Sequence, residues 1–186
     1  MTEVRHLTTP LTDEVVRSLR AGDRVLLSGR VYTARDAAHK RLVEAIDAGQ
    51  PLPFEPQGQV IYYVGPSPTK PGDVIGSAGP TTAGRVDYYT IPLLARGLKG
   101  MIGKGKRSAE VRQAMMEYGA VYLVAVGGAA ALIADRITRV ELVAYEDLGT
   151  EAIRCLEVEA FPLMVANDTH GADVYEQGKA AYRRLP

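Results

Sequence analysis

Strand-like and helix-like segments alternate along nearly the whole chain, and this alternation constrains the fold more than any other feature. Runs rich in β-branched and aliphatic residues are typical of β structure: 24–33 is expected to form a strand or a hairpin, and 60–66 a strand. Between such runs, 33–49 and 107–119 carry apolar residues at helical spacing and end at a glycine. Strands that alternate with helices predict an α/β fold.

The same patterns assign most of the remaining chain, after a polar lead-in. A helix is expected from Thr82 to Gly97, bent or split at Pro92. Thr33, with Asp36 three residues later, has the spacing of a capping box for the helix at 33–49. The other expected strands lie at 74–80, 100–105, 120–126, 137–147, 152–161 and 162–168, and the other helices at 11–22, 129–135 and 172–185, with a glycine turn at 127–128.

Length and composition predict a single domain over residues 1–186, because one domain usually holds about 100 to 200 residues. Apolar residues make up 46% of the chain and charged residues 24%, which is ordinary for a soluble globular protein. No internal repeat or low-complexity segment is present. A sizeable core is therefore expected.

Charge and hydropathy argue against several classes of partner. Lys plus Arg and Asp plus Glu both number 22, so the chain has no overall positive field for nucleic acid or an anionic membrane. No run approaches the roughly 20 apolar residues of a membrane span, and the N-terminal segment lacks a signal-peptide core. We expect a cytoplasmic protein that binds neither nucleic acid nor membrane.

Metal-ligating residues are scarce. Cys155 is the only cysteine, and the three histidines are scattered, whereas structural zinc and iron–sulfur sites need three or four ligands. We therefore expect no metal site on this chain and interpret Cys155 as a small core residue. The segment 168–171, with Asp168, His170 and Gly171, is interpreted as a turn.

The loop SAGPTTAGR (77–85) is the first candidate for a binding site. Glycines at 76, 79 and 84 would let the backbone approach a ligand, and a following helix would direct free N–H groups at an anion. Thr81 and Arg85 add a hydroxyl group and a planar fork suited to a carboxylate or phosphate. The alternative is a glycine-proline turn with a capping threonine and a solvated arginine.

Two further segments offer cations. Arg35 is expected in the first turn of a helix, where the helix dipole disfavours positive charge. It therefore either binds a ligand, is compensated by the neighbouring Asp36, or is solvated. GMIGKGKRS (100–108) matches the start of a phosphate-binding loop but has Arg107 where a Ser or Thr is needed. Lys104 or Lys106 then remains as a point charge on a glycine-flanked turn.

Three motifs in this order resemble a known family: TARDAAHKRL (33–42), GPTTAGRVDYYT (79–90) and GMIGKGKRS (100–108). Together they resemble the carboxyl-terminal domain of the iron–sulfur (class I) fumarases, a separate β subunit in two-subunit members. The same family includes β subunits of L-tartrate dehydratases. Their motifs have a cysteine near the RD segment and a non-glycine before the loop arginine, whereas this chain has Ala34, Ala38 and Gly84, which favours fumarase.

The resemblance implies a swivelling β/β/α domain of three layers that completes an active site built largely on a partner. That partner is an α subunit whose three cysteines bind a 4Fe–4S cluster, in an α2β2 complex or around a β dimer. The implied activity is the reversible hydration of fumarate to malate. Carried over by motif, Thr81 is catalytic and the substrate-binding residues are Arg35, Arg85 and Lys104, with Lys106 as the alternative lysine.

The residue chemistry agrees with that assignment, since three cations suit a dicarboxylate dianion. A threonine hydroxyl is a poor base, so the catalytic role of Thr81 requires a strongly lowered pKa from nearby cations, a helix N-terminus and exclusion of water. Two alternatives remain: an L-tartrate dehydratase β subunit, and a noncatalytic module that binds anions with the same loops.

Overall fold

The computed structural model describes residues 4–126 and 128–184. Gly127 of the expected glycine turn and Leu185 of the expected last helix lie outside these residues. The strands are β1 (Arg5–Thr8), β2 (Arg24–Thr33), β3 (Val60–Tyr62), β4 (Gly100–Gly103), β5 (Val121–Val124), β6 (Ile137–Ala144) and β7 (Ile153–Asn167). The helices are α1 (Asp13–Ser18), α2 (Asp36–Asp47), α3 (Asp87–Leu94), α4 (Ala109–Tyr118), α5 (Ala130–Ala134) and α6 (Val174–Tyr182), with 3-10 turns η1 (Ala83–Val86) and η2 (Glu146–Glu151).

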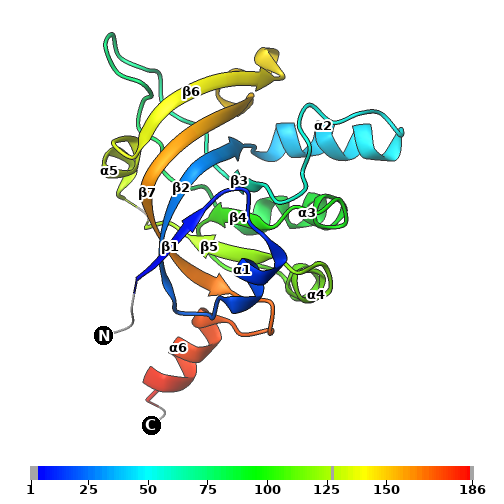
Figure 1. Cartoon of the computed structure of the whole chain (residues 1–186), viewed down its shortest axis with the longest axis vertical. Helices are drawn as coiled ribbons and strands as arrows, with labels where there is room; N and C mark the ends of the chain where they lie inside the picture. Colours follow the sequence, from blue (N-terminus) through cyan, green and yellow to red (C-terminus); the bar gives the residue numbers. More distant parts are fainter. Residues whose placement is uncertain (1–3, 127, 185–186) are drawn as a thin grey trace.

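The sheet closes into a small barrel (Figure 1). β2, β3, β4 and β5 are parallel neighbours in that order. β7 pairs antiparallel with both β5 and β2, which completes the ring. β1 extends the sheet parallel to β2, and β6 extends it antiparallel to β7. The predicted α/β class is confirmed.

The strands bury apolar side chains on both faces. In β3, Val60 and Tyr62 belong to a core cluster drawn from strands all around the ring. Ile61 and the following Tyr63 belong to a second cluster with side chains of α2, α3 and α4. Because successive side chains of a strand point to opposite faces, one short strand contributes to both cores. Figure 1 shows these three helices on the same side of the barrel.

β7 is one continuous strand of 15 residues where the sequence predicts two strands, 152–161 and 162–168. Proline lacks an N–H group and normally interrupts a central strand. Pro162 lies near a β-bulge in β7, where Glu159 and Ala160 together oppose Ser28 of β2. There Ala160 takes a positive φ of 47° and its N–H donates to Ser28 Oγ at 3.0 Å. The predicted break was therefore wrong: Pro162 pairs with Leu26 on one side and lies between the part of β7 that pairs with β6 and the part that pairs with β5, where a missing N–H group interrupts no ladder.

Three other expectations change at the level of elements. The polar lead-in contains β1, which is only four residues long and depends on pairing with β2. The segment 74–80 is not a strand, and only Pro80 makes a bridge, to Val64. The helix expected from Thr82 begins as η1, changes to α3 at Asp87 and keeps Pro92 inside α3.

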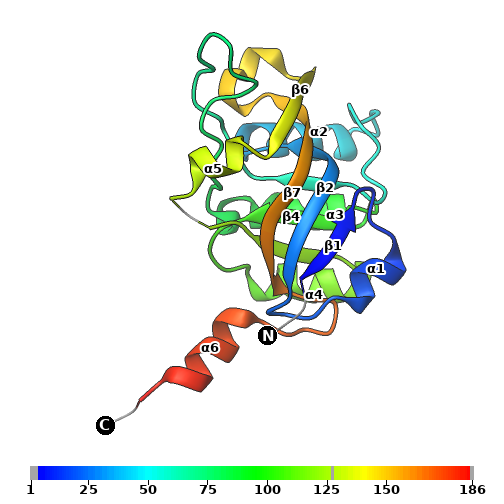
Figure 2. The ribbon, with the colours of Figure 1, turned by 60° about the vertical axis from the view of Figure 1, so that its left-hand side comes forward.

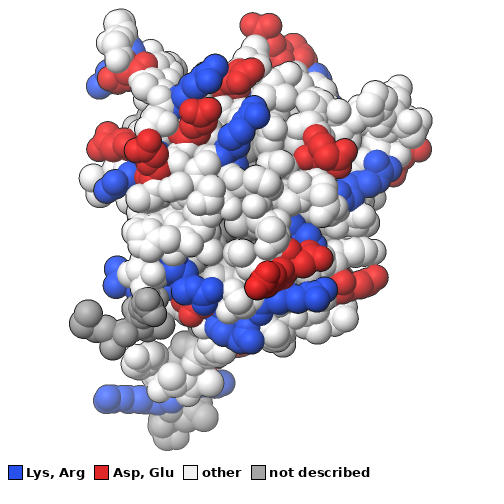
Figure 3. All heavy atoms as spheres, in the orientation of Figure 1, with Lys and Arg blue, Asp and Glu red and all other residues white. Residues whose placement is uncertain are grey.

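α6 extends away from the barrel (Figure 2) and has no buried residue. On the face shown in Figure 3, basic and acidic side chains are interspersed, in keeping with the equal numbers of the two kinds. Among residues 4–126 and 128–184, no helix is long and apolar enough to cross a membrane.

Candidate functional site

The residues singled out by sequence gather where neighbouring parallel strands end. Arg35 follows β2, Lys104 follows β4, and Thr81 is hydrogen-bonded to Tyr63, which follows β3. The carboxyl ends of parallel strands meet at one edge of a sheet, which is the usual place for a ligand in α/β proteins. The topology therefore brings three separate motifs to one edge of the barrel.

Arg35 is the N-cap residue of α2, and its largely buried side chain lies across Gly65. A Cβ atom at Gly65 would lie 2.6 Å from Nη1 and 3.1 Å from Cδ of Arg35. Glu151 Oε1 is 3.8 Å from Nη2 of Arg35. The glycine after β3 therefore provides the space through which the arginine reaches this edge.

Asp36 joins the two predicted arginines. Its carboxylate lies 3.1 Å from Nε of Arg85, which donates a hydrogen bond, and 3.9 Å from Nε of Arg35. The Arg85 side chain is 57% exposed, so the Asp36 contact leaves most of it open to solvent. Two cations from distant motifs thus meet around one carboxylate.

The predicted capping box at the start of α2 is wrong. The Thr33 hydroxyl donates to the carbonyl of Ala152 and accepts from the N–H of Arg154, so it is bound to β7. The N–H of Ala37 donates instead to Glu151 Oε2 at 2.9 Å. A distant carboxylate thus replaces the local side-chain cap.

Thr81 is held by a main-chain carbonyl. Its N–H and its hydroxyl group both donate to the carbonyl oxygen of Tyr63, at 2.8 and 2.9 Å. A hydroxyl that donates to a carbonyl is stabilised in its protonated form. In this conformation the Thr81 hydroxyl group is therefore neutral, and it is not deprotonated to act as a general base.

The glycine-rich loop before Thr81 packs mainly against the chain itself. A Cβ atom at Gly76 would overlap the carbonyl of Ser67, and one at Gly79 would lie 3.0 Å from Ala130 Cβ. The N–H of Ala83 at the start of η1 donates to the Lys104 carbonyl, so it does not point freely into the loop. Internal packing therefore explains two of the three glycines that we had expected to admit a ligand.

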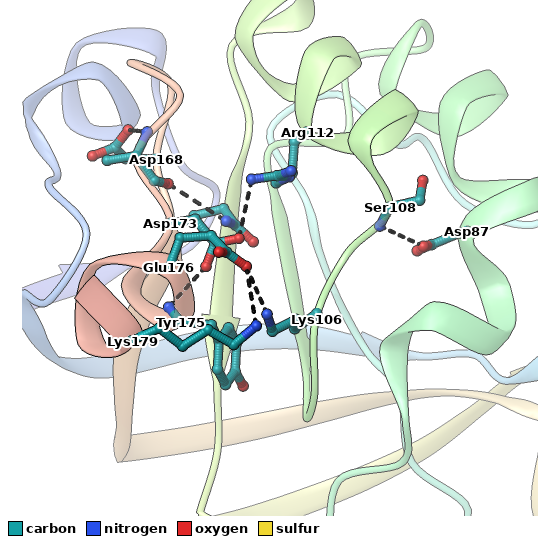
Figure 4. Close-up of polar contacts among 11 residues, drawn as sticks. Asp87, Lys106, Ser108, Arg112, Asp168, Asp173, Tyr175, Glu176 and Lys179 are labelled. Carbon is teal, nitrogen blue, oxygen red and sulfur yellow. Dashed lines mark hydrogen bonds and ion pairs between the residues drawn. The ribbon is translucent and has the colours of Figure 1, made fainter. Parts of the chain in front are cut away.

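The two candidate lysines differ in their partners. Figure 4 shows Lys106 reaching α6, where its Nζ lies 2.6 Å from Glu176 Oε1. The hydrogen bond to Lys106 lowers the pKa of Glu176, and the same contact raises the pKa of Lys106. Across the part of the chain that the structure describes, Lys104 has no ion-pair partner. Lys104 is therefore the freer cation.

Lys104 lines a cavity of about 470 Å³ between β5, β7 and α6. The main chain of Lys104 is tied to the loop of Thr81, since its N–H donates to the Thr81 carbonyl at 3.0 Å. The arginine pair and Thr81 do not line that cavity. The structure thus links Arg35 to Arg85 through the Asp36 carboxylate and connects Lys104 by its backbone to the loop that carries Thr81 and Arg85.

Two buried residues behind the site were not identified as functional candidates from the sequence. His39 is fully buried, and its Nδ1 donates to the Arg35 carbonyl at 2.9 Å; burial lowers its pKa to about 4. Arg107, which interrupts the phosphate-loop pattern, has a fully buried side chain that donates to Tyr63 Oη and to Thr90 Oγ1. Only the mismatch in the loop pattern hinted that Arg107 was unusual.

Comparison with known proteins decides the relationship. The family model described as Fumarase C-terminus matches residues 2–178. The chain belongs to this fumarase C-terminus family. It is 40% identical over 182 residues to a Methanocaldococcus jannaschii protein provisionally named L(+)-tartrate dehydratase subunit beta, which covers 94% of this chain and 93% of that protein.

Longer relatives of this fumarase C-terminus chain are named fumarate hydratases. It is 44% identical over 156 residues to the anaerobic class I fumarate hydratase of Escherichia coli and 42% identical over 158 residues to fumarate hydratase 2 of Leishmania major. These matches cover 83% and 84% of this chain. The chain spans only 28% of each of those two proteins.

The described residues of this fumarase C-terminus chain do not form a set suited to binding a cluster. Its one thiol, Cys155, is buried as predicted and accepts a hydrogen bond from Nε of Arg30 at 3.1 Å. In the described ranges, no group of three or more His, Cys, Asp or Glu residues is placed to hold a metal ion.

The segment with Asp168 is a turn, as predicted. The Asp168 carboxylate accepts from the N–H groups of Ala21, His170 and Ala172 at 2.9 to 3.1 Å. The ring of His170 contacts the carbonyl of Arg17. These contacts fix the loop against the end of α1, and they account for both polar side chains structurally.

Proposed function

We propose that this chain is the β subunit of a two-subunit iron–sulfur fumarate hydratase, which interconverts fumarate and (S)-malate only when the α subunit is bound. Membership of the fumarase C-terminus family supports hydro-lyase activity. The Methanocaldococcus jannaschii relative, which has a similar length and is named a β subunit, supports a separate chain. The meeting of Arg35 and Arg85 at Asp36 is the observation that carries the proposal.

In this proposal Arg35, Arg85 and Lys104 bind the two carboxylates of the substrate. Planar guanidinium groups suit bidentate carboxylate binding, and a lysine adds a point charge. Asp36 offsets part of the positive charge and orients Arg85 before the substrate arrives. A dianion then binds to an arrangement that is still net cationic.

Thr81 is assigned to proton transfer at the carbon that loses or gains hydrogen. Hydration adds a hydroxyl group to one carbon of the double bond and a proton to the other, and dehydration reverses both changes. The Thr81 hydroxyl now donates to the Tyr63 carbonyl. To exchange a proton with the substrate it must give up that acceptor, which we assign to closure of the site by the α subunit.

The α subunit is proposed to bind a 4Fe–4S cluster through three cysteines, since this chain offers no ligand set for one. When bound, the cluster supplies a Lewis acid for the substrate hydroxyl group. The swivelling three-layer arrangement, an α2β2 assembly or a β dimer, and a cytoplasmic location belong to the same proposal. In it, the barrel and its helices move as one unit over the partner.

An L-tartrate dehydratase β subunit is the second candidate. The Methanocaldococcus jannaschii relative, provisionally named a tartrate dehydratase subunit, favours this candidate. It is 40% identical to this chain, and the match covers 93% of that protein. Ala34, Ala38 and Gly84, at positions where the tartrate dehydratase motifs differ, favour fumarate. A module that only binds anions is the remaining alternative.

An anaerobic assay of the chain mixed with a cluster-reconstituted α subunit tests the proposal. Fumarate, malate and tartrate are compared, with each chain alone as a control. Fumarate hydration only in the mixture is the expected result. If the complex converts tartrate but not fumarate, the chain is instead an L-tartrate dehydratase β subunit. If a stable, cluster-loaded complex converts neither substrate, the anion-binding module is favoured.

A further inference from the structure

A buried histidine lies directly behind Arg35. His39 has no exposed surface, and Nδ1 lies 2.9 Å from the Arg35 carbonyl oxygen. A carbonyl oxygen only accepts, so Nδ1 carries the proton in this contact. Nε2 has no hydrogen-bond partner among the described residues. The Arg35 carbonyl also accepts the main-chain N–H of His39 at 2.8 Å, so the ring adds a second bond to this acceptor, and that bond distinguishes the ring from an apolar side chain of similar size.

His39 also packs against the residue that holds Thr81. Its ring meets the ring of Tyr63 edge-on, with centroids 5.3 Å apart. Tyr63 is 1% exposed, and its carbonyl oxygen is the acceptor for both the N–H and the hydroxyl group of Thr81. One pair of touching rings thus supports Arg35 on one side and Thr81 on the other.

Arg107 fixes the far end of Tyr63. Its Nη1 donates to Tyr63 Oη at 2.9 Å, and its guanidinium group lies 5.3 Å from the centroids of both Tyr63 and Tyr122. An ion pair with Asp87 at 2.9 Å compensates the buried charge. The Tyr63 ring is therefore held at its hydroxyl end and along its face, which limits its movement.

We propose that His39 and Tyr63 are positioning residues that set Arg35 and Thr81 relative to each other. Neither side chain is placed at the reacting atoms; they act through the main chain of Arg35 and through the Tyr63 carbonyl. The inference rests on the proposed function for the roles of Arg35 and Thr81. A purely structural role would change stability and leave substrate binding by the folded complex unchanged.

The test compares His39→Leu with His39→Asn. Asparagine keeps a donor near the position of Nδ1, whereas leucine keeps bulk and removes the donor. In the assembled complex, His39→Leu is expected to raise KM for fumarate about five- to tenfold, the effect of one buried hydrogen bond, with a smaller change in kcat. His39→Asn is expected to restore most of the loss. Equal KM values for the native and leucine proteins, or no restoration by asparagine, would overturn the inference.

A second readout is independent of activity. In the isolated chain, His39→Leu is expected to shift the NMR signal of the Arg35 Nε–H group, and His39→Asn to return it toward the native position. Signals that stay at their native positions in both would contradict positioning. An inactive native complex with the expected shifts would overturn the proposed function and leave this arrangement standing.

Tyr63→Phe keeps the inference testable if His39→Leu does not fold. This variant preserves the ring and the Tyr63 carbonyl and removes the hydroxyl that Arg107 contacts. The Thr81 N–H is expected to exchange with solvent about tenfold faster, because its acceptor is less firmly held. A native exchange rate at Thr81 would contradict the role of Tyr63.

Discussion

At the scale of single residues, the basic side chains at the carboxyl ends of the parallel strands differ in whether an acidic side chain pairs with them. Lys106 is bound to Glu176, and Arg107 is buried against Asp87. Arg85 shares Asp36 with Arg35 and stays more than half exposed. Lys104 has no ion-pair partner in the described ranges. Of the three cations that the family motifs assign to substrate binding, the two arginines share one carboxylate, and only Lys104 is without an ion pair in the described ranges.

Lys104→Met is expected to raise KM for fumarate at least about tenfold in the assembled complex, because a charge-assisted contact to a carboxylate is lost. Lys106→Met is the matched control, since that lysine is already occupied by Glu176. Steady-state kinetics of both variants provide the measurement. Equal losses from the two substitutions would contradict the choice of Lys104.

His39 makes stability depend on pH. Burial lowers its pKa to about 4, whereas an unfolded histidine titrates near 6.5, so between these values the unfolded chain binds more protons. The free energy of unfolding is expected to fall by about 3 kcal/mol from this group as pH drops through that window. Urea unfolding of the native protein and His39→Leu measures the difference, with Asp36 and Arg107 beside the ring in both. An unchanged pH dependence in the variant would refute this account.

Residue-level prediction succeeded where a motif carried the information and failed where the fold created it. The strand at 24–33 and the helices starting near residues 36 and 109 follow from local patterns. The contacts of His39 and Arg107 depend on Tyr63, which arrives from another element. The helical spacing places His39 on the buried face of α2 with Leu42 and Val43, but it does not reveal which side chain the ring meets there. The burial of Arg107 has no local signal, because Arg107 precedes α4 and belongs to no apolar pattern.

At the scale of elements, the start of α2 is set by tertiary contacts. Glu151, at the end of η2, accepts from the N–H of Ala37 and lies near the guanidinium group of Arg35. The capping-box pattern failed because Thr33 was already bound to β7. The end of β3 completes the arrangement, since Gly65 leaves room for the Arg35 side chain.

Gly65→Ala is therefore expected to displace Arg35 with little loss of stability. The added Cβ would meet the far end of a flexible side chain, and the backbone of Gly65 has no positive φ. KM for fumarate is expected to rise about tenfold, while the urea midpoint stays near the native value. Gly178→Ala is the control, because no atom lies near that position. A native KM for Gly65→Ala would show that the position of Arg35 does not depend on the space left by Gly65.

At the scale of the whole molecule, closure of the barrel by β2 and β7 assembles the site. This pairing joins Arg24–Tyr32 to Cys155–Met164 and so brings Glu151 beside Arg35. The sequence predicts the α/β class but not this ring, because the proline in β7 suggests a break and the pairing joins segments that lie far apart in the sequence. One edge of the closed sheet then carries Arg35, Thr81 and Lys104.

The most direct test of the central claim is fumarate turnover by the reconstituted complex carrying Arg35→Met or Arg85→Met. Arg41→Met is a matched control, because Arg41 pairs with Asp147 and lies outside the proposed site. We predict a loss of about 100-fold in kcat/KM for each site variant, as expected when a charged hydrogen bond to a carboxylate is removed, and little change in the control. Native turnover by both site variants, with complex formation and cluster content unchanged, would contradict the claim that this edge binds the substrate.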